Sequence, residues 1–323
     1  TIKAQNNLKK VVFVEADNVK VLRAAQMAFE EGVAIPILLG KKNIIEGLME
    51  EFAIELPNLE IIDPKSDNQK EKRVSYGKVF FENRKRKGFT EYEAIQIMRE
   101  RNYYGSMMVD QGDADAMITG VTRGYRTCIK PAIQCVGLRK DVNVVSGMYI
   151  LNTKRGPLFL ADTTINLNPS AEEIAEITVN VAKTIRKFNI IPKIALLSYS
   201  NFGSSPGEDA DKMSNAVRLL HENHPNIIVD GEVQANFALD SELMNDKFSF
   251  SQLANKQVNT LIFPNLSAGN ISYKLLQQMS DGDAIGPILI GLNKSIHVMQ
   301  LGASVREINN MVKIAATQSQ NKK

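Results

Sequence analysis

The sequence contains no tryptophan, only two cysteines and only three histidines among 323 residues. So few histidines and cysteines give little support for a metal site, because these side chains are the usual ligands of zinc. No nucleic-acid-binding motif is present, so we expect no nucleic-acid partner. No run of about 18 apolar residues occurs, so we expect neither a transmembrane helix nor a membrane partner.

Standard motifs for phosphate and acyl chemistry are also missing. The sequence has no GxGxxG after a strand and no GxxxxGK[ST], which argues against a standard dinucleotide site or Walker loop. It has no GxSxG elbow and no obvious nucleophile–base pair. A catalytic site, if there is one, has to be built from less standard parts.

The two cysteines, Cys128 and Cys135, are seven residues apart. On a helix this spacing separates them by about 10 Å, whereas a disulfide requires Cα atoms within about 7 Å. We therefore expect free thiols and a cytoplasmic location, where thiols stay reduced.

Apolar residues make up 44% of the sequence, charged residues make up 23%, and the formal net charge is +3. These are ordinary values for a soluble globular protein, and the length suggests two domains or one large α/β unit. The start, "TIKAQNNLKK", has no apolar segment typical of a signal peptide. It also lacks methionine, so we expect the chain to be a part of a longer protein.

Short apolar runs alternate with amphipathic helical patterns along almost the whole chain, which predicts an α/β fold with mostly parallel sheets. Long helices are expected over 67–85 and 90–111, and Thr90–Glu93 and Ser170–Glu173 have capping-box spacing. The runs "VNVVSGMYIL" and "GPLFLADTT", joined by "NTKRG", predict a hairpin near residue 150. We expect one domain from 1–142 plus 288–323 and a second from 143–287.

Four loops rich in small polar residues follow predicted strands, at 119–127, 198–207, 263–270 and 299–304. Ligands of doubly wound sheets bind at the carboxyl ends of the strands, and such loops offer N–H groups and hydroxyls to a phosphate or carbonyl. Each loop alone is more simply a connecting turn, but four together favour a binding site. The candidate ligand-binding residues in these loops are Thr122, Arg123, Ser198, Ser200, Asn201, Gly203, Asn265, Gly269, Asn270 and Gly302. Asp230 and Glu232, in "VDGEVQ", are either acids of the site or caps of the following helix, and we favour the caps.

The segments "MMVDQGDADAMITGVTRGYRTCIKPAIQCVG", "VDGEVQAN" and "LIFPNLSAGNISYKLLQQM" resemble, in order and spacing, the phosphate acetyl- and butyryltransferases. The resemblance runs from about Lys10 to Ala316. It implies two α/β/α domains with an isocitrate/isopropylmalate dehydrogenase-like fold, acetyl-CoA or CoA as ligand in a cleft between them, a homodimer and no metal.

The resemblance also locates the catalytic positions, and several of them differ. The family's Ser-Arg pair falls on Gln300 and Leu301, and its aspartate falls on Glu307. One family arginine falls on Lys130, and another falls on Arg84 or, in a second register, on Arg86. Leucine cannot replace a cationic donor, and lysine lacks the bidentate fork of arginine. Glu307 is either a base or simply a solvated helix carboxylate. Together these changes predict impaired acyl transfer.

The segments "LLSYSNFGS" and "HVMQLGASVREINNM" are most similar to the C-terminal phosphotransacetylase-like domain of bacterial NADP-dependent malic enzymes. This similarity implies a regulatory and oligomerisation domain that binds acyl-CoA, with higher oligomers in the full-length protein. NADP and a divalent metal, used in decarboxylating malate to pyruvate, would then bind only in a separate malic-enzyme domain. Two alternatives stay open: an active phosphate acetyltransferase that uses Glu307 and Lys130, and a purely structural dimerisation module.

Overall fold

The computed structural model describes residues 1–57, 59–279 and 284–320. The chain divides into two compact units, one formed by residues 1–138 with 292–323 and the other by residues 139–291. These boundaries lie four residues from those expected from the sequence. Each unit has its own sheet.

The sheet of the first unit has five strands in the order β11-β4-β1-β2-β3, all parallel. Its strands are β1 (Lys9–Phe13), β2 (Ala34–Leu39), β3 (Glu60–Ile62), β4 (Ala116–Thr119) and β11 (Ser295–Val298). The strand residues are mostly buried, as expected for a parallel sheet covered on both faces. The last strand, β11, therefore joins a sheet whose other strands come from the start of the chain.

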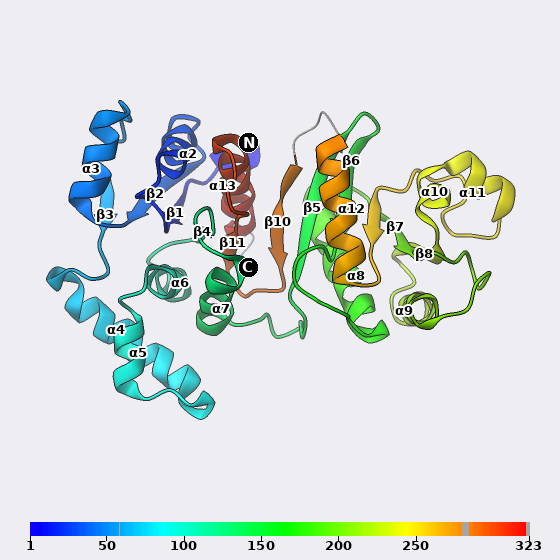
Figure 1. Cartoon of the computed structure of the whole chain (residues 1–323), viewed down its shortest axis with the longest axis horizontal. Helices are drawn as coiled ribbons and strands as arrows, with labels where there is room; N and C mark the ends of the chain where they lie inside the picture. Colours follow the sequence, from blue (N-terminus) through cyan, green and yellow to red (C-terminus); the bar gives the residue numbers. More distant parts are fainter. Residues whose placement is uncertain (58, 280–283, 321–323) are drawn as a thin grey trace. The chain divides into compact units, whose positions relative to one another are not determined.

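Helices cover both faces of this sheet. The helices are α1 (Ile2–Gln5), α2 (Val19–Glu30), α3 (Lys42–Glu51), α4 (Lys70–Arg84), α5 (Glu91–Ile97), α6 (Arg101–Gln111), α7 (Tyr125–Val136) and α13 (Val305–Ser319). Two 3-10 turns, η1 (Asp67–Gln69) and η2 (Lys85–Lys87), flank α4. Helices α2 and α13 pack together on one face, and α6 and α7 pack together on the other (Figure 1).

The sheet of the second unit has six strands in the order β10-β5-β6-β9-β7-β8. Its strands are β5 (Ser146–Thr153), β6 (Gly156–Ala161), β7 (Lys193–Leu197), β8 (Ile228–Val233), β9 (Thr260–Ile262) and β10 (Ala284–Ile290). Strands β5 and β6 form the expected hairpin and β10 pairs antiparallel to β5, while the remaining pairs are parallel. The helices are α8 (Ala171–Arg186), α9 (Glu208–Asn223), α10 (Ala235–Leu239), α11 (Ser241–Lys247) and α12 (Leu266–Met279). The α/β class with mostly parallel sheets is thus confirmed.

One expected helix is interrupted. The pattern over 90–111 predicts a continuous helix, but α5 ends at Ile97 and α6 begins at Arg101. Glu100 between them has an extended backbone, with φ −83° and ψ 126°. The break allows α5 to pack on α4 while α6 turns almost entirely into the core, so tertiary packing overrides the local pattern.

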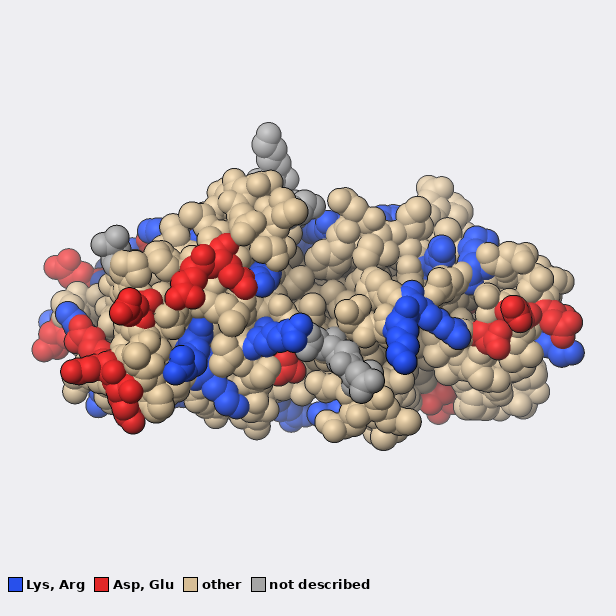
Figure 2. Space-filling model, turned by 90° about the horizontal axis from the view of Figure 1, so that it is seen from above, with Lys and Arg blue, Asp and Glu red and all other residues tan. Residues whose placement is uncertain are grey.

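Surface charge is dispersed. On the face that Figure 2 draws, acidic and basic side chains lie among larger uncharged areas. Both cysteines lie on α7, buried and without a disulfide. Among the described residues, no helix is long and apolar enough to cross a membrane.

Candidate functional site

At the carboxyl ends of the first unit's strands, loops that are far apart in the sequence contact each other. The loop 299–304 follows β11, and the loop 119–127 follows the neighbouring strand β4. The Met299 N–H donates to the Thr119 carbonyl at 2.6 Å, and the Gly302 N–H donates to the Val121 carbonyl at 3.2 Å. Two of the four loops singled out in the sequence therefore form one surface.

A buried carboxylate, Glu15, supports this surface from below. It follows β1 and is only 3% exposed. Its two oxygens accept hydrogen bonds from the N–H groups of Gly120 and Val121, both at 3.1 Å. Burial raises the pKa of Glu15, and the two N–H donors oppose that rise. Glu15 is not among the residues predicted from the sequence, although an acid directly after an apolar strand was a signal for it.

Gly120 itself has to be glycine. Its φ is +94°, a backbone conformation that L side chains rarely adopt. A Cβ at this position would lie 2.7 Å from the carbonyl oxygen of Met299. The close approach of the two loops thus depends on the absent side chain.

The turn at 300–302 keeps its backbone geometry but lacks a cation at its centre. Gly302 has φ +78°, and its carbonyl accepts a bond from the Lys20 ammonium at 3.4 Å. Leu301 is 65% exposed, so an apolar side chain lies on the surface of the turn. Gln300, beside it, is half-buried. The side chains of this turn are an amide and a leucine, and they include no hydroxyl or guanidinium.

Glu307 serves the start of α13. Its Oε2 accepts bonds from the N–H and the hydroxyl of Ser304, both at 2.8 Å, and the Ser304 hydroxyl accepts from the Glu307 N–H at 3.2 Å. This reciprocal pair is a capping box, which satisfies donors that a helix start leaves open. A role as a base would compete with this structural role.

The basic residues predicted for the first unit fall into two groups. Arg84 donates from Nε to the Gln134 carbonyl at 3.0 Å and from Nη2 to the Ile133 carbonyl at 3.2 Å. Its guanidinium therefore binds the last turn of α7 rather than facing open solvent. Arg123 lies in the 119–127 loop, exposed, with Nη1 3.6 Å from the Glu100 carboxylate. Two more predicted residues, Thr122 and Lys130, are also exposed.

In the second unit, the loop 198–207 is organised by the buried carboxylate of Glu232 at the end of β8. Oε1 of Glu232 accepts bonds from the Ser200 hydroxyl at 2.9 Å and from the Gly203 N–H at 2.6 Å. Asn201 accepts the Gln234 N–H at 2.9 Å, and the Ser198 hydroxyl accepts the Ser200 N–H at 3.2 Å. The predicted residues of this loop are brought together, but several of their polar groups hold the loop itself.

The expectation that Asp230 and Glu232 cap the following helix is wrong. Helix α10 has Gln234 at its N-cap, without a side-chain capping bond. Asp230 instead accepts bonds from the hydroxyl of Ser251 and the N–H of Gln252, both at 2.8 Å. Both acids lie within β8, and their side chains accept hydrogen bonds from segments that are distant in the sequence. Their closeness to α10 along the chain therefore did not predict their partners.

The 263–270 loop is shorter than expected, because α12 already begins at Leu266. The Asn265 Oδ1 accepts the Ala268 N–H at 3.0 Å, and the Asn270 Nδ2 donates to the Thr163 carbonyl at 3.1 Å. A Cβ on Gly269 would lie 2.3 Å from the carbonyl oxygen of Asp162. These three predicted residues fix the first turn of α12 against the end of β6.

Asp162, which no sequence pattern singled out, is the counterpart of Glu15 in this unit. It is 4% exposed, and its oxygens accept N–H bonds from Gly147 at 3.0 Å, Thr164 at 2.9 Å and Asn166 at 2.8 Å. Burial raises its pKa, and the surrounding N–H donors oppose the rise. The Asn166 side-chain amide also donates to it at 2.6 Å, but its other partners are backbone groups, which leave no mark in the sequence.

A polar pocket of about 490 Å³ lies at this carboxyl edge of the second unit. It is lined by Leu167, Asn168, Tyr199, Glu208, Asp209, Asn265 and Ser267. Its size falls within the range of about 300–1,000 Å³ that is typical of small-molecule sites. The pocket therefore presents hydroxyls, amides and two carboxylates to a polar ligand, and these lining residues include no nucleophile–base pair.

Comparison with known proteins agrees with this arrangement. The family model described as phosphate acetyl/butaryl transferase matches residues 1–316. The chain is 37% identical over 318 residues to a phosphate acetyltransferase of Helicobacter pylori, covering 98% of the chain and 60% of that protein. It is 37% identical over 317 residues to an NADP-dependent malic enzyme of Escherichia coli, covering 97% of the chain and 41% of that enzyme.

A solved structure extends the comparison to three dimensions. A phosphotransacetylase from Streptococcus pyogenes superposes with a TM-score of 0.90 and 32% identity, covering 99% of this chain and 97% of that one. Thus the chain spans about half the length of the two relatives above and nearly all of this third protein. The family model, the two relatives and the structure agree, and the chain belongs to the phosphate acetyl/butaryl transferase family.

Proposed function

We propose that this chain binds acyl-CoA at its strand-end loops, transfers acyl groups to phosphate poorly, and acts as a regulatory domain of an NADP-dependent malic enzyme. One observation carries the proposal. The 300–302 turn keeps its left-handed glycine and its bond to the neighbouring loop, yet an exposed Leu301 stands where the resemblance places an arginine. A site with its shape kept and its central donor lost is suited to binding more than to turnover.

The magnitude of the loss follows from the chemistry. Acyl transfer to phosphate builds negative charge on the acyl oxygen, and a fixed donor at that point stabilises the transition state. Removing one such donor typically lowers the rate about a hundred- to a thousand-fold. Lys130 retains a charge where the resemblance has an arginine, but it offers no bidentate fork to phosphate. The capping bonds of Glu307 further oppose its use as a base.

The regulatory part of the proposal draws on the similarity to the malic enzyme of Escherichia coli, in which the match covers 41% of the length. A ligand can regulate a distant site only if it binds two states of the protein with different affinities. We propose acetyl-CoA as that ligand, with inhibition as its effect.

Calorimetric titration of acetyl-CoA into the chain tests the binding. Saturable binding at or below millimolar ligand is expected. Gly302→Val should weaken it, because valine is strained at φ +78°, whereas Leu301→Ala should leave it nearly unchanged. Absence of binding at millimolar acetyl-CoA would overturn this proposal and favour a purely structural dimerisation module.

An active phosphate acetyltransferase is the second candidate, and a specific observation favours it. The match to the Streptococcus pyogenes phosphotransacetylase covers 97% of that chain, so the similarity extends over nearly all of a protein with that name. This agreement in length supports transferase activity more directly than the partial match supports a malic-enzyme parent. The candidate requires Glu307 and Lys130 to act in catalysis, and it predicts acetyl-CoA formation from acetyl phosphate and CoA that is lost in Glu307→Gln.

A further inference from the structure

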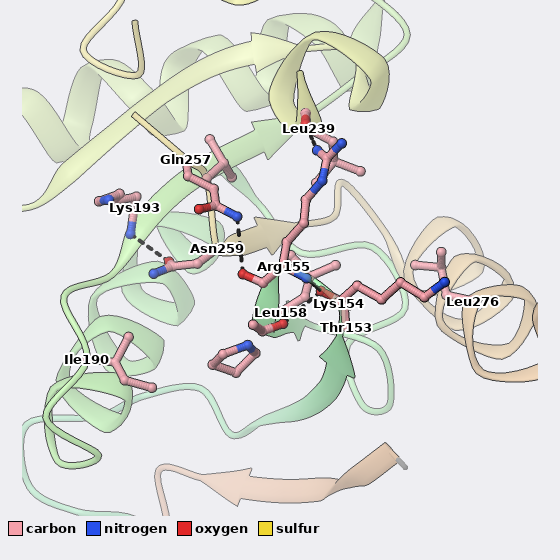
Figure 3. Close-up of a pocket in the computed structure, with 13 residues that line it drawn as sticks. Thr153, Lys154, Arg155, Leu158, Ile190, Lys193, Leu239, Gln257, Asn259 and Leu276 are labelled. Carbon is pink, nitrogen blue, oxygen red and sulfur yellow. Dashed lines mark hydrogen bonds between the residues drawn. The ribbon is translucent and has the colours of Figure 1, made fainter. Parts of the chain in front are cut away.

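The second unit has another pocket, of about 560 Å³, which lies away from the strand-end loops (Figure 3). Its walls come from the β5–β6 hairpin, from Lys193 at the start of β7, and from residues 257–259 just before β9. These are the amino ends of β6, β7 and β9. A five-residue strand spans about 16 Å, so this pocket and the carboxyl-edge loops lie on opposite edges of the same sheet.

The inner surface of the pocket is mainly apolar. Its apolar lining residues are Pro157, Leu158, Ile190, Leu239, Val258 and Leu276. Leu158 and Val258 belong to the hydrophobic core of the unit, and Leu276 on α12 packs against that core. The volume is that of a typical small-molecule site, and such sites are mostly apolar with a few polar groups. The lining thus favours a ligand with an apolar portion.

Three cationic side chains, and no carboxylate, complete the lining. These are Lys154 and Arg155 on the hairpin and Lys193 on β7. Within the part of the chain that the structure describes, neither lysine ammonium has a hydrogen-bond or ion-pair partner. Figure 3 shows Lys154 extending toward Leu276, while Arg155 runs toward Leu239, whose carbonyl it binds at 2.8 Å. An excess of unpaired positive charge favours an anionic ligand.

The frame of the pocket is held by hydrogen bonds. The Gln257 Nε2 donates to the Arg155 carbonyl at 3.2 Å, and the Thr153 hydroxyl donates to the Gly156 carbonyl at 2.8 Å. The Asn259 side chain accepts the Lys193 N–H at 2.8 Å. Both the hairpin and the start of β7 are therefore fixed before any ligand arrives, which lowers the entropy lost on binding.

We propose that this pocket binds a small amphipathic anion. Its apolar chain packs on Leu158, Val258 and Leu276, and its carboxylate or phosphate head binds a lysine ammonium at the rim, that of Lys154 or Lys193. The two sites differ in their lining, because the polar pocket at the carboxyl edge includes Glu208 and Asp209, whereas this pocket combines apolar side chains with lysines. This inference is independent of the proposed function, because the two sites share no residue.

The lack of tryptophan in the chain provides a clean probe. In the otherwise unchanged full chain, Ile190→Trp places a single indole in the pocket wall. Decanoate and decyl phosphate, each below its micelle concentration, are titrated against its fluorescence, with decyltrimethylammonium as the cationic control. We expect a saturable change with at least one anion, and their relative affinities tell a carboxylate ligand from a phosphate ligand. Calorimetry with the unaltered chain repeats the titration, so a poorly folded Ile190→Trp variant does not affect the outcome.

Charge reversal locates the binding. The double variant Lys154→Glu/Lys193→Glu should weaken anion binding about tenfold or more, since it replaces two attractions by two repulsions. Lys140→Glu is the control, because it makes the same change of charge at one site away from the pocket. Lys140 follows Arg139, whose N–H donates to the Gly291 carbonyl just beyond the other end of β10. The proposal is overturned if neither anion binds at millimolar concentration, if the cation binds equally well, or if the double variant binds as tightly as Lys140→Glu.

Discussion

Three strand-end loops of this protein are each organised by one buried carboxylate. Glu15 holds the loop after β4, Glu232 holds the loop after β7, and Asp162 holds the loop after its own strand. All three are nearly inaccessible to solvent, and a buried acid requires such partners to remain in the fold. The residues that a ligand would meet are therefore positioned by residues that it does not touch.

This arrangement explains which site residues could be predicted. Gln300, Leu301 and Gly302 were identified because a turn of that composition is visible in the sequence and in the family resemblance. Glu15 and Asp162 were missed because most of their partners are backbone N–H groups, which every residue but proline carries. Arg84 was identified from the resemblance, but its bonds to the end of α7 depend on packing that a linear pattern does not contain.

A buried histidine makes the stability depend on pH. His297 on β11 is fully buried, and burial lowers its pKa to about 4 from the ordinary 6.5. The folded-state pKa is lower than the unfolded-state pKa. The contribution of neutral His297 to the free energy of unfolding is therefore complete above pH 6.5, and it is lost as the pH falls from there through 4. We expect the free energy of unfolding to fall by about 3 kcal/mol across this window through this residue.

Urea unfolding at several pH values, for the native chain and for His297→Gln, measures that contribution as a difference. The variant should be less stable at pH 7 and should show a shallower decline on acidification. Parallel pH curves for the two proteins would contradict the assignment.

At the scale of elements, most helices and strands follow from the sequence. The capping boxes at Thr90–Glu93 and Ser170–Glu173 are confirmed. A third, Ser304–Glu307, was overlooked because Glu307 was considered only as a family catalytic position or a solvated carboxylate. The break at Glu100 was not predictable, since it arises from the different surfaces on which α5 and α6 pack.

The third capping box separates a structural role of Glu307 from a catalytic one. Ser304→Ala should lower the free energy of unfolding by about 1 kcal/mol, because it removes the acceptor for the Glu307 N–H. Glu307→Gln should change stability less, since glutamine also serves at this position of a capping box. Thermal and urea unfolding check both values. If Glu307→Gln destabilises the chain as strongly as Ser304→Ala, the carboxylate charge itself supports the helix start.

The second unit is formed by one continuous segment of the chain, whereas the first unit is formed by two. All strands of the second unit lie between residues 146 and 290, whereas the first unit needs β11 and α13 from the end of the chain. The apolar run "GPILIGLNKSIHVM" contributes to β10 of one unit and contains β11 of the other. Alternation of strands and helices predicts sheets, but it does not tell which sheet a strand joins.

This continuity predicts different behaviour for two fragments. A fragment of residues 139–291 should fold alone and unfold cooperatively, because it retains its complete sheet and core. A fragment of residues 1–291 should lose the structure of its first unit, since it lacks buried residues of β11 and α13 such as Ile296 and Met311. Circular dichroism and amide proton dispersion in NMR spectra distinguish the two. A well-folded first unit in the longer fragment would contradict the prediction.

The central claim is that the 300–302 turn retains a ligand site whose catalytic donor is lost. The rate of acetyl-CoA formation from acetyl phosphate and CoA, compared between the native chain and Gln300→Ser/Leu301→Arg, tests it most directly. We predict a very low native rate and an increase of at least about a hundredfold in the double variant, in line with restoring one fixed donor. A native rate that is already efficient, and that the double variant does not raise, would contradict the claim and establish the transferase.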